Sequence, residues 1–200
     1  MRNRDMRFRG NCPRNPFQRD RIPLEAQFLS KSMHDAKNNN CTKENVNVMT
    51  KQEMVDRLPA SKFVDIGRCA SMEWLIFDDG EELSLHLQCS WRLIVNDQLR
   101  LVSDDIFEQP EGQEYDENFD WDVQGDNRFD HLASDLKREL PLAVRSVHLS
   151  SENDLVIEFD KGSLLYVFAG RPLDAEAWRF FVHHGESSHL VAVGRLLEEQ

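Results

Sequence analysis

The 200 residues suffice for one ordinary domain with a sizeable core, and no run of about 18 apolar residues predicts a membrane-spanning helix. The N-terminus lacks the apolar segment of a secretory signal, and the four cysteines (Cys12, Cys41, Cys69 and Cys89) lack metal-binding or disulfide-framework spacing, which favours reduced thiols in a cytoplasm. The net charge of −12 combines +5 for residues 1–50 (ten Lys/Arg, five Asp/Glu) with −17 for the other 150 residues (fourteen and thirty-one). This asymmetry is a first indication about partners.

The first 48 residues are basic and poor in apolar side chains. They contain seven arginines within MRNRDMRFRGNCPRNPFQRDRIP and a second polar stretch, KNNNCTKENVN. Such a segment cannot bury enough apolar surface to offset the entropy lost on ordering. We therefore predict a disordered tail over residues 1–48 and an acidic domain over 49–200. Basic arms can bind nucleic acid weakly, and the plain alternative is a solvated tail.

Regular structure is predicted from TKQEMVDRL onward. Thr50 and Glu53 match the capping box at the start of a helix, and Pro59 ends it. Short segments rich in β-forming residues follow, some separated by turn signals such as DDG and NDQ: KFVDIGRC, MEWLIFD, ELSLHLQC, WRLIVN and QLRLVSD.

A second helix is predicted in NRFDHLASDLKREL, after a long acidic segment. Its N-cap is Asp126 or Asn127, Pro141 stops it, and its apolar residues recur at helical spacing: Phe129, Leu132, Leu136 and Leu140. The strands then resume in VRSVHLS, DLVIEFD, SLLYVFAG and WRFFVHH. The ending HLVAVGRLLEE fits either a strand or a short helix.

The two strand-rich halves resemble each other. LIFDDGEELSLHL precedes WRLI in the first half, and IEFDKGSLLYVF precedes WRFF in the second. This indicates either an internal duplication of a β-meander or independent use of one kind of hairpin. Alternation along a strand would place Trp91 and Trp178 in the core and Arg92 and Arg179 outside, near carboxylates. We therefore interpret both Trp-Arg pairs as structural rather than catalytic.

The sequence lacks recognisable catalytic or metal-binding patterns. His183, His184 and His189 have no established ligand spacing, and neighbouring residues on a strand face opposite sides. There is no Gly-x-Ser-x-Gly elbow and no glycine-rich phosphate loop. Cys89 lies in an alternating strand and is expected to be buried. We predict no catalytic residue, no metal site and no cofactor, and we expect that the chain is not an enzyme.

The strongest signal is the segment DDIFEQPEGQEYDENFDWDVQGD. It holds ten carboxylates and no Lys or Arg, interleaved with aromatic residues. A solvated loop is one interpretation; a calcium site is another, but the D-x-D-x-D-G spacing is missing. The third is a surface for a basic protein partner, on which aromatics bury area and charges speed encounter. The predicted partner-binding residues are Asp105, Phe107, Tyr115, Asp116, Glu117, Asp120, Trp121 and Asp122.

Three segments resemble a family of small uncharacterised bacterial proteins with an H-x-Q-C-x-W-R strand, an S-x-D-x-(F/Y) continuation and an F-D-W-D element before a helix. The resemblance covers roughly residues 70–195 and carries no activity across. It implies that these segments belong together at one site. The matching positions are His86, Gln88, Cys89, Trp91, Arg92, Ser103, Asp105, Phe107, Phe119, Asp120, Trp121 and Asp122.

The expected fold is α+β: a single domain of two antiparallel β-meanders with an intervening helix, in which the sheet is either open or half-barrel-like. The expected function is that of a non-catalytic cytosolic binding protein, of the immunity or antitoxin type, that neutralises a basic partner through the acidic aromatic loop. The alternative is an enzyme or small-ligand-binding domain that uses a cleft between the two meanders. A neighbouring toxin or secretion gene would favour the first, and a metabolic operon the second.

Overall fold

The structure is a computed structural model that describes residues 49–172, 174–183, 189–194 and 196–199. The predicted tail over residues 1–48 and the candidate ligand His184 lie outside the described residues. Within the described residues, no helix is long and apolar enough to cross a membrane.

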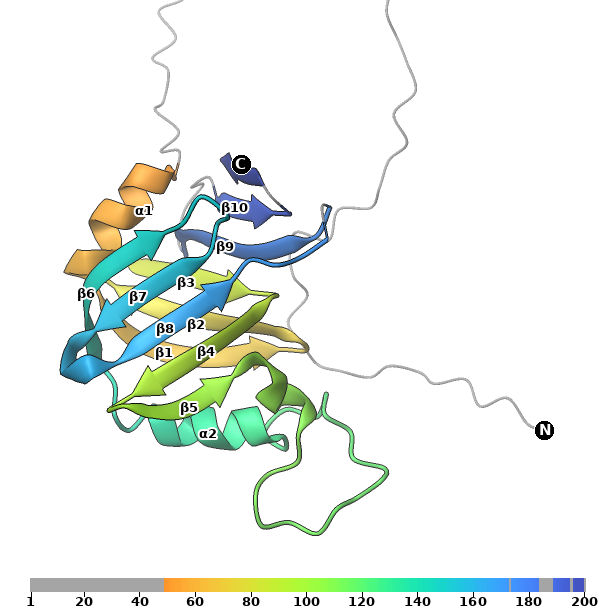
Figure 1. Cartoon of the computed structure of the whole chain (residues 1–200). Helices are drawn as coiled ribbons and strands as arrows, with labels where there is room; N and C mark the ends of the chain where they lie inside the picture. Colours follow the sequence, from red (N-terminus) through yellow and green to blue (C-terminus); the bar gives the residue numbers. More distant parts are fainter. Residues whose placement is uncertain (1–48, 173, 184–188, 195, 200) are drawn as a thin grey trace, which may run out of the picture. The chain divides into compact units, whose positions relative to one another are not determined.

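The described chain is dominated by antiparallel strands (Figure 1). In chain order these are β1 (Lys62–Cys69), β2 (Met72–Asp78), β3 (Glu82–Leu87), β4 (Ser90–Val95), β5 (Gln98–Val102), β6 (Leu142–Leu149), β7 (Leu155–Phe159), β8 (Leu164–Phe168), β9 (Glu176–Val182), β10 (Leu190–Val193) and β11 (Leu196–Glu199). They form one 11-stranded sheet in the order β11-β10-β9-β3-β2-β1-β6-β7-β8-β4-β5. The ambiguous C-terminal segment is therefore the hairpin of β10 and β11.

The sheet folds back on itself where β1 meets β6. These two strands share only two residue pairs, Lys62 with Ala143 and Phe63 with Leu142. On either side of this junction the strands form two facing layers (Figure 1). We call β1-β2-β3-β9-β10-β11 layer A and β6-β7-β8-β4-β5 layer B.

The helices are short and cover the ends of the two layers. They are α1 (Lys51–Arg57), η1 (Leu58–Ala60), η2 (Ser103–Phe107), α2 (Arg128–Leu136) and η3 (Asp160–Gly162). The Thr50 hydroxyl accepts a hydrogen bond from the Glu53 amide (3.1 Å) and so caps α1, as expected. Asn127 caps α2 in the same way, and α2 packs against both β5 and β1.

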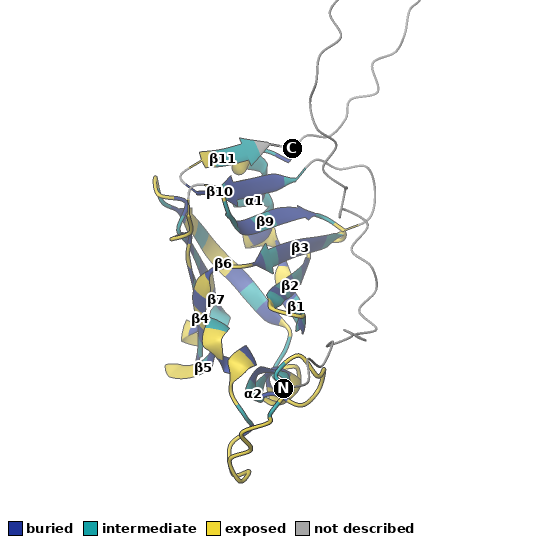
Figure 2. Cartoon of the chain, turned by 90° about the vertical axis from the view of Figure 1, so that its right-hand side faces the viewer, coloured by how far each residue is buried: buried dark blue, intermediate teal, exposed yellow. Residues whose placement is uncertain are grey.

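The apolar core fills the space between the layers. Phe63 and Phe77 of layer A and Phe159 of layer B form an aromatic cluster with ring centroids 5.6 to 6.5 Å apart. Trp91 and Trp178 belong to the same core. Figure 2 shows much of the central strands buried and the connection between η2 and α2 largely exposed.

The prediction of an α+β fold made of two separate meanders with a helix between them is wrong. The two halves of the chain exchange strands: β3 pairs with β9 and β8 pairs with β4. Consequently β1–β5 and β6–β10 occupy equivalent places in the strand order, and each half contributes its last two strands to the layer of the other.

The reason lies between β3 and β4, where no turn interrupts the chain. Buried residues alternate in one phase through both strands: Leu83, Leu85, Leu87, Cys89, Trp91, Leu93 and Val95. At the junction, the Gln88 amide donates to the Ala177 carbonyl (2.8 Å). Because the chain does not reverse there, β4 cannot pair with β3; it leaves layer A and continues into layer B, as at the corner of a sandwich.

Two of the four cysteines, Cys69 and Cys89, lie within the described residues, while Cys12 and Cys41 lie outside them. Cys89 is a buried free thiol, and burial raises its pKa to about 12. Cys89 is therefore a packed core residue rather than a reactive nucleophile.

Candidate functional site

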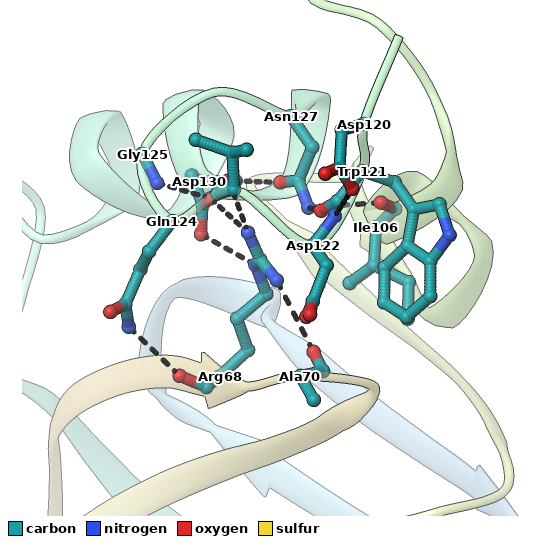
Figure 3. A network of polar contacts seen from close by, with 11 residues as sticks. Arg68, Ala70, Ile106, Asp120, Trp121, Asp122, Gln124, Gly125, Asn127 and Asp130 are labelled. Atoms are coloured by element: carbon teal, nitrogen blue, oxygen red, sulfur yellow. Dashed lines mark hydrogen bonds and ion pairs between the residues drawn. The ribbon is translucent and has the colours of Figure 1, made fainter. Parts of the chain in front are cut away.

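The acidic segment, residues 104–126 (hereafter the acidic loop), includes most of η2 and ends just before the N-cap of α2. Its base is organised by Asn127, which is fully buried. The Asn127 side-chain amide donates to the carbonyls of Ile106 (2.9 Å) and Trp121 (3.1 Å), and its oxygen accepts from the Asp130 amide (2.9 Å) (Figure 3). One side chain thus caps α2 and joins both arms of the loop.

A buried ion pair fixes the C-terminal arm of the acidic loop to layer A. Arg68 of β1 is 3% exposed and binds both carboxylate oxygens of Asp130, at 2.9 and 2.7 Å (Figure 3). The same guanidinium donates to the Val123 carbonyl (2.8 Å), and Asp130 also accepts from the Gly125 amide (2.7 Å). A bidentate pair of this kind constrains both distance and orientation.

Asp105 belongs to the scaffold of the loop rather than to its outer surface. It is 6% exposed, accepts from the Val102 amide (2.8 Å) and lies 3.3 Å from the Arg128 guanidinium. Burial raises the pKa of its carboxyl. Arg128 also pairs with Glu111 at 2.7 Å. Of the predicted partner-binding residues, Asp105 is therefore placed where a partner cannot reach its carboxylate.

The remaining predicted acids lie in solvent. Asp116, Glu117, Asp120 and Asp122 are exposed. The Asp116 and Asp120 carboxylates each accept a hydrogen bond from the backbone amide two residues later in the chain, with N to O distances of 2.9 and 3.1 Å. These hydrogen bonds shape local turns. Within the described chain, the salt bridges of the loop reach only Asp105 and Glu111, both through Arg128. Eight of its ten carboxylates therefore have no ion-pair partner there.

The aromatic residues of the loop are also accessible. Tyr115 is 86% exposed and Phe107 is 52% exposed. Phe107 packs edge-on against half-buried Trp121, with ring centroids 5.1 Å apart. The three rings and the exposed carboxylates lie on one anchored connection, so an apolar and an acidic surface are available together.

The two Trp-Arg pairs lie away from this loop. Trp91 is 2% exposed and Trp178 is 0% exposed, both in the core. Arg179 binds Glu176 of its own strand, with 2.7 Å between Nε and Oε1. Arg92 instead lies over the rings of Tyr166 and Phe168 on the outside of layer B. Neither arginine pairs with the acidic loop, which is held by Arg68 and Arg128.

The alternative of a cleft between two meanders finds no counterpart in the architecture, because core side chains fill the space between the layers. A surface cavity of about 370 Å³ lies between α1 and β6 and is lined by Lys51, Gln52, Val55, Val147, His148 and Leu149. Its lining holds no carboxylate or thiol to accompany His148 in acid–base chemistry. Among the described residues, no three His, Cys, Asp or Glu side chains are grouped to hold a metal ion.

Asn127→Ala should loosen the acidic loop and lower the free energy of unfolding by about 2 kcal/mol, because the helix cap and the partners of two carbonyls are lost together. Denaturant unfolding gives the stability, and hydrogen exchange over residues 104–126 gives the local effect. Asn118→Ala is the matched control, since Asn118 lies exposed within the same loop. Equal effects of the two substitutions would contradict the anchoring role of Asn127.

Sequence reasoning identified the acidic loop but missed the residues that position it. Arg68 breaks the apolar pattern of its strand, and a buried arginine requires a buried acceptor; this was the available signal. Sequence reasoning also missed the outer side of layer B, where Tyr166 and Phe168 lie. Their segment, SLLYVF, is apolar in both alternating sets, which is typical of a strand covered on both sides.

Comparison with protein-family models, curated proteins and solved structures finds no match to this chain.

Proposed function

We propose that this protein is a non-catalytic binding protein that holds a basic protein partner on the acidic loop. The observation that carries the proposal is the combination of eight carboxylates without an ion pair in the described chain and two exposed aromatic rings, Tyr115 and Phe107, on one anchored connection. A loop that was only a solvated linker would need neither exposed aromatic rings nor a base that is anchored by buried side chains.

The acidic and aromatic groups have different tasks in this proposal. The carboxylates steer a cationic surface toward the loop and reject acidic competitors, an effect that acts over about 10 Å at 0.1 M salt. Trp121 and its neighbours supply the apolar contact area that keeps the partner bound. The immunity or antitoxin role and the cytoplasmic location are part of the same proposal: neutralising a basic toxin requires an acidic surface with rigid anchors.

Neutralising four exposed acids (Asp116→Asn, Glu117→Gln, Asp120→Asn and Asp122→Asn) should slow association with the partner and flatten its salt dependence, while the fold survives. Trp121→Ala should act mainly on dissociation and cost about 2 kcal/mol of binding. A partner captured from the native host provides the ligand, and surface plasmon resonance between 50 and about 500 mM salt provides both rates.

A matched control is the neutralisation of Asp135 and Glu152, which are exposed acids outside the loop. The proposal predicts that this variant has the association rate of the unmodified protein in moderate salt. Unchanged affinity and unchanged salt dependence of binding in both the quadruple variant and Trp121→Ala would overturn the proposal. The partner would then bind elsewhere on the protein.

A further inference from the structure

The outer face of layer B is unusually apolar for a sheet surface. Strand register places its outward residues in two rows across the layer. One row is His148, Val156, Tyr166, Arg92 and Val102; the next is Ser146, Glu158, Leu164, Ile94 and Leu99. Beyond the first row, Phe168 extends the apolar surface along β8. The face of an antiparallel sheet that is exposed to solvent normally carries polar residues.

These apolar side chains are accessible in the described chain. Leu99 is 63% exposed and Phe168 is 40% exposed, while Ile94, Tyr166 and Leu164 are half-buried. Contiguous apolar surface of this kind marks interaction sites rather than ordinary surface. The face is separate from the acidic loop and carries none of the residues proposed above for the basic partner.

Two charges of opposite sign interrupt the apolar face, one on each side of β8. Arg92 on β4 lies 4.8 Å from the centre of the Tyr166 ring and 5.6 Å from that of Phe168. Glu158 on β7 is exposed, and one of its oxygens accepts from the Ser146 hydroxyl (2.7 Å). Since both flanking strands pair with β8, this strand is the centre line between the two charges.

We infer that this face binds a second copy of the chain, related by a two-fold axis that runs along β8. Such an axis stacks β8 of one protomer on β8 of the other. It also places β4 of each protomer over β7 of its partner. Arg92 then lies over the row of Val156, one outward residue, or about 7 Å, from Glu158 of that protomer. In the single chain the Arg92 guanidinium lies over Tyr166 and Phe168, on the side away from the row of Glu158. In the proposed dimer the side chain turns the other way along the strand to span this gap, so that two equivalent ion pairs form around an apolar centre.

Charge favours a like copy over other occupants of this face. The chain carries −12 overall, so a copy approaching most of its surface meets repulsion. The positive charge of Arg92 and the negative charge of Glu158 cancel. The central part of this face is therefore neutral and self-complementary, as an isologous interface requires. A basic partner would find no excess of acids here, and an oligonucleotide would find only the guanidinium of Arg92, across β8 from the carboxylate of Glu158.

Analytical ultracentrifugation over a concentration series tests the inference. The unmodified protein should form a dimer. Arg92→Glu and Glu158→Arg should each weaken dimerisation about tenfold or more, because each creates two like-charge contacts. The double variant should restore the dimer with reversed pairs, and mixing the two single variants should give a heterodimer. Arg138→Glu, at an exposed position in the turn after α2, is the matched control and should dimerise like the unmodified chain.

Three results would overturn the inference. One is a monomer at every concentration. Another is a dimer that neither single variant weakens, since it would use a different surface. The third is binding of a single-stranded oligonucleotide by a monomeric chain that depends on Tyr166 and Phe168, since the face would then be a stacking platform. Circular dichroism of each variant separates loss of folding from loss of contact.

Discussion

The stability of this protein should decrease as the pH rises from about 5 to about 8, and Glu73→Gln should remove that part of the dependence. Glu73 lies on β2 and is 2% exposed, and its Oε1 atom is buried without a hydrogen-bond partner among the described residues. Burial raises the pKa of its carboxyl from 4.5 to about 8; the Glu73 amide, the Trp91 indole and the Arg68 guanidinium oppose that rise less strongly.

The direction follows from proton linkage. Below about pH 4.5, both the folded and the unfolded chain hold the Glu73 proton, so ionisation has no effect on stability. Between about 4.5 and 8, the unfolded chain loses the proton while the folded chain keeps it, so the free energy of unfolding falls steadily. A difference of about 3.5 between the two pKa values corresponds to ~5 kcal/mol at about 1.36 kcal/mol per unit.

Denaturant unfolding of both proteins from pH 5 to pH 9 measures the effect. At pH 5 the two should differ by about 1 kcal/mol or less, as expected for one isosteric exchange in the core. At pH 9 the Gln variant should be more stable by several kcal/mol. Glu114→Gln, in the exposed acidic loop, serves as the control and should keep the slope of the unmodified protein. Parallel pH curves for the unmodified protein and Glu73→Gln would show that Glu73 is ionised in the folded state.

Strand positions could be predicted from the sequence because alternation is a local signal, whereas strand pairing could not. The capping of α1 by Thr50 follows from the residues beside it and was found. The pairing of β3 with β9 joins residues almost a hundred positions apart, such as Leu85 with Phe180. The one local clue was the lack of a turn between Cys89 and Trp91, where the interpretation of a meander required a reversal.

The acidic loop could be located because composition alone marks it, but its anchoring depends on the fold. Asp105 and Asp116 belong to the same acidic run, yet one is buried beside Arg128 and the other is exposed. The difference arises because η2 turns Asp105 back toward the Val102 amide. Arg68 contacts the loop only because β1 packs next to it in the fold. This proximity cannot be predicted from the order of residues in the sequence.

Trp178→Ala and Trp91→Ala should each lower the free energy of unfolding by roughly 3–5 kcal/mol, because each leaves a large cavity between the layers. Replacement by Phe should separate the two positions. The Trp178 indole donates to the Asn153 carbonyl (2.8 Å), so Trp178→Phe also leaves a buried acceptor without a partner, at a cost of about 1–3 kcal/mol. The Trp91 Nε1 atom is buried and has no hydrogen-bond partner in the described part of the chain, so Trp91→Phe carries no such cost.

Chemical denaturation of the four variants measures these differences, and the pH dependence of Trp91→Phe provides a second test. The Trp91 indole opposes the rise in the pKa of Glu73, although its Nε1–H does not meet the geometry of a hydrogen bond to that carboxyl. Its removal should therefore raise the pKa of Glu73 further above 4.5 and extend the loss of stability to higher pH. Trp178→Phe should leave the pH range unchanged. Full stability of Trp91→Ala or Trp178→Ala would refute the structural interpretation of these residues. Equal costs for the two Phe variants would instead show that the Trp91 indole is hydrogen-bonded in solution, with Glu73 as its acceptor.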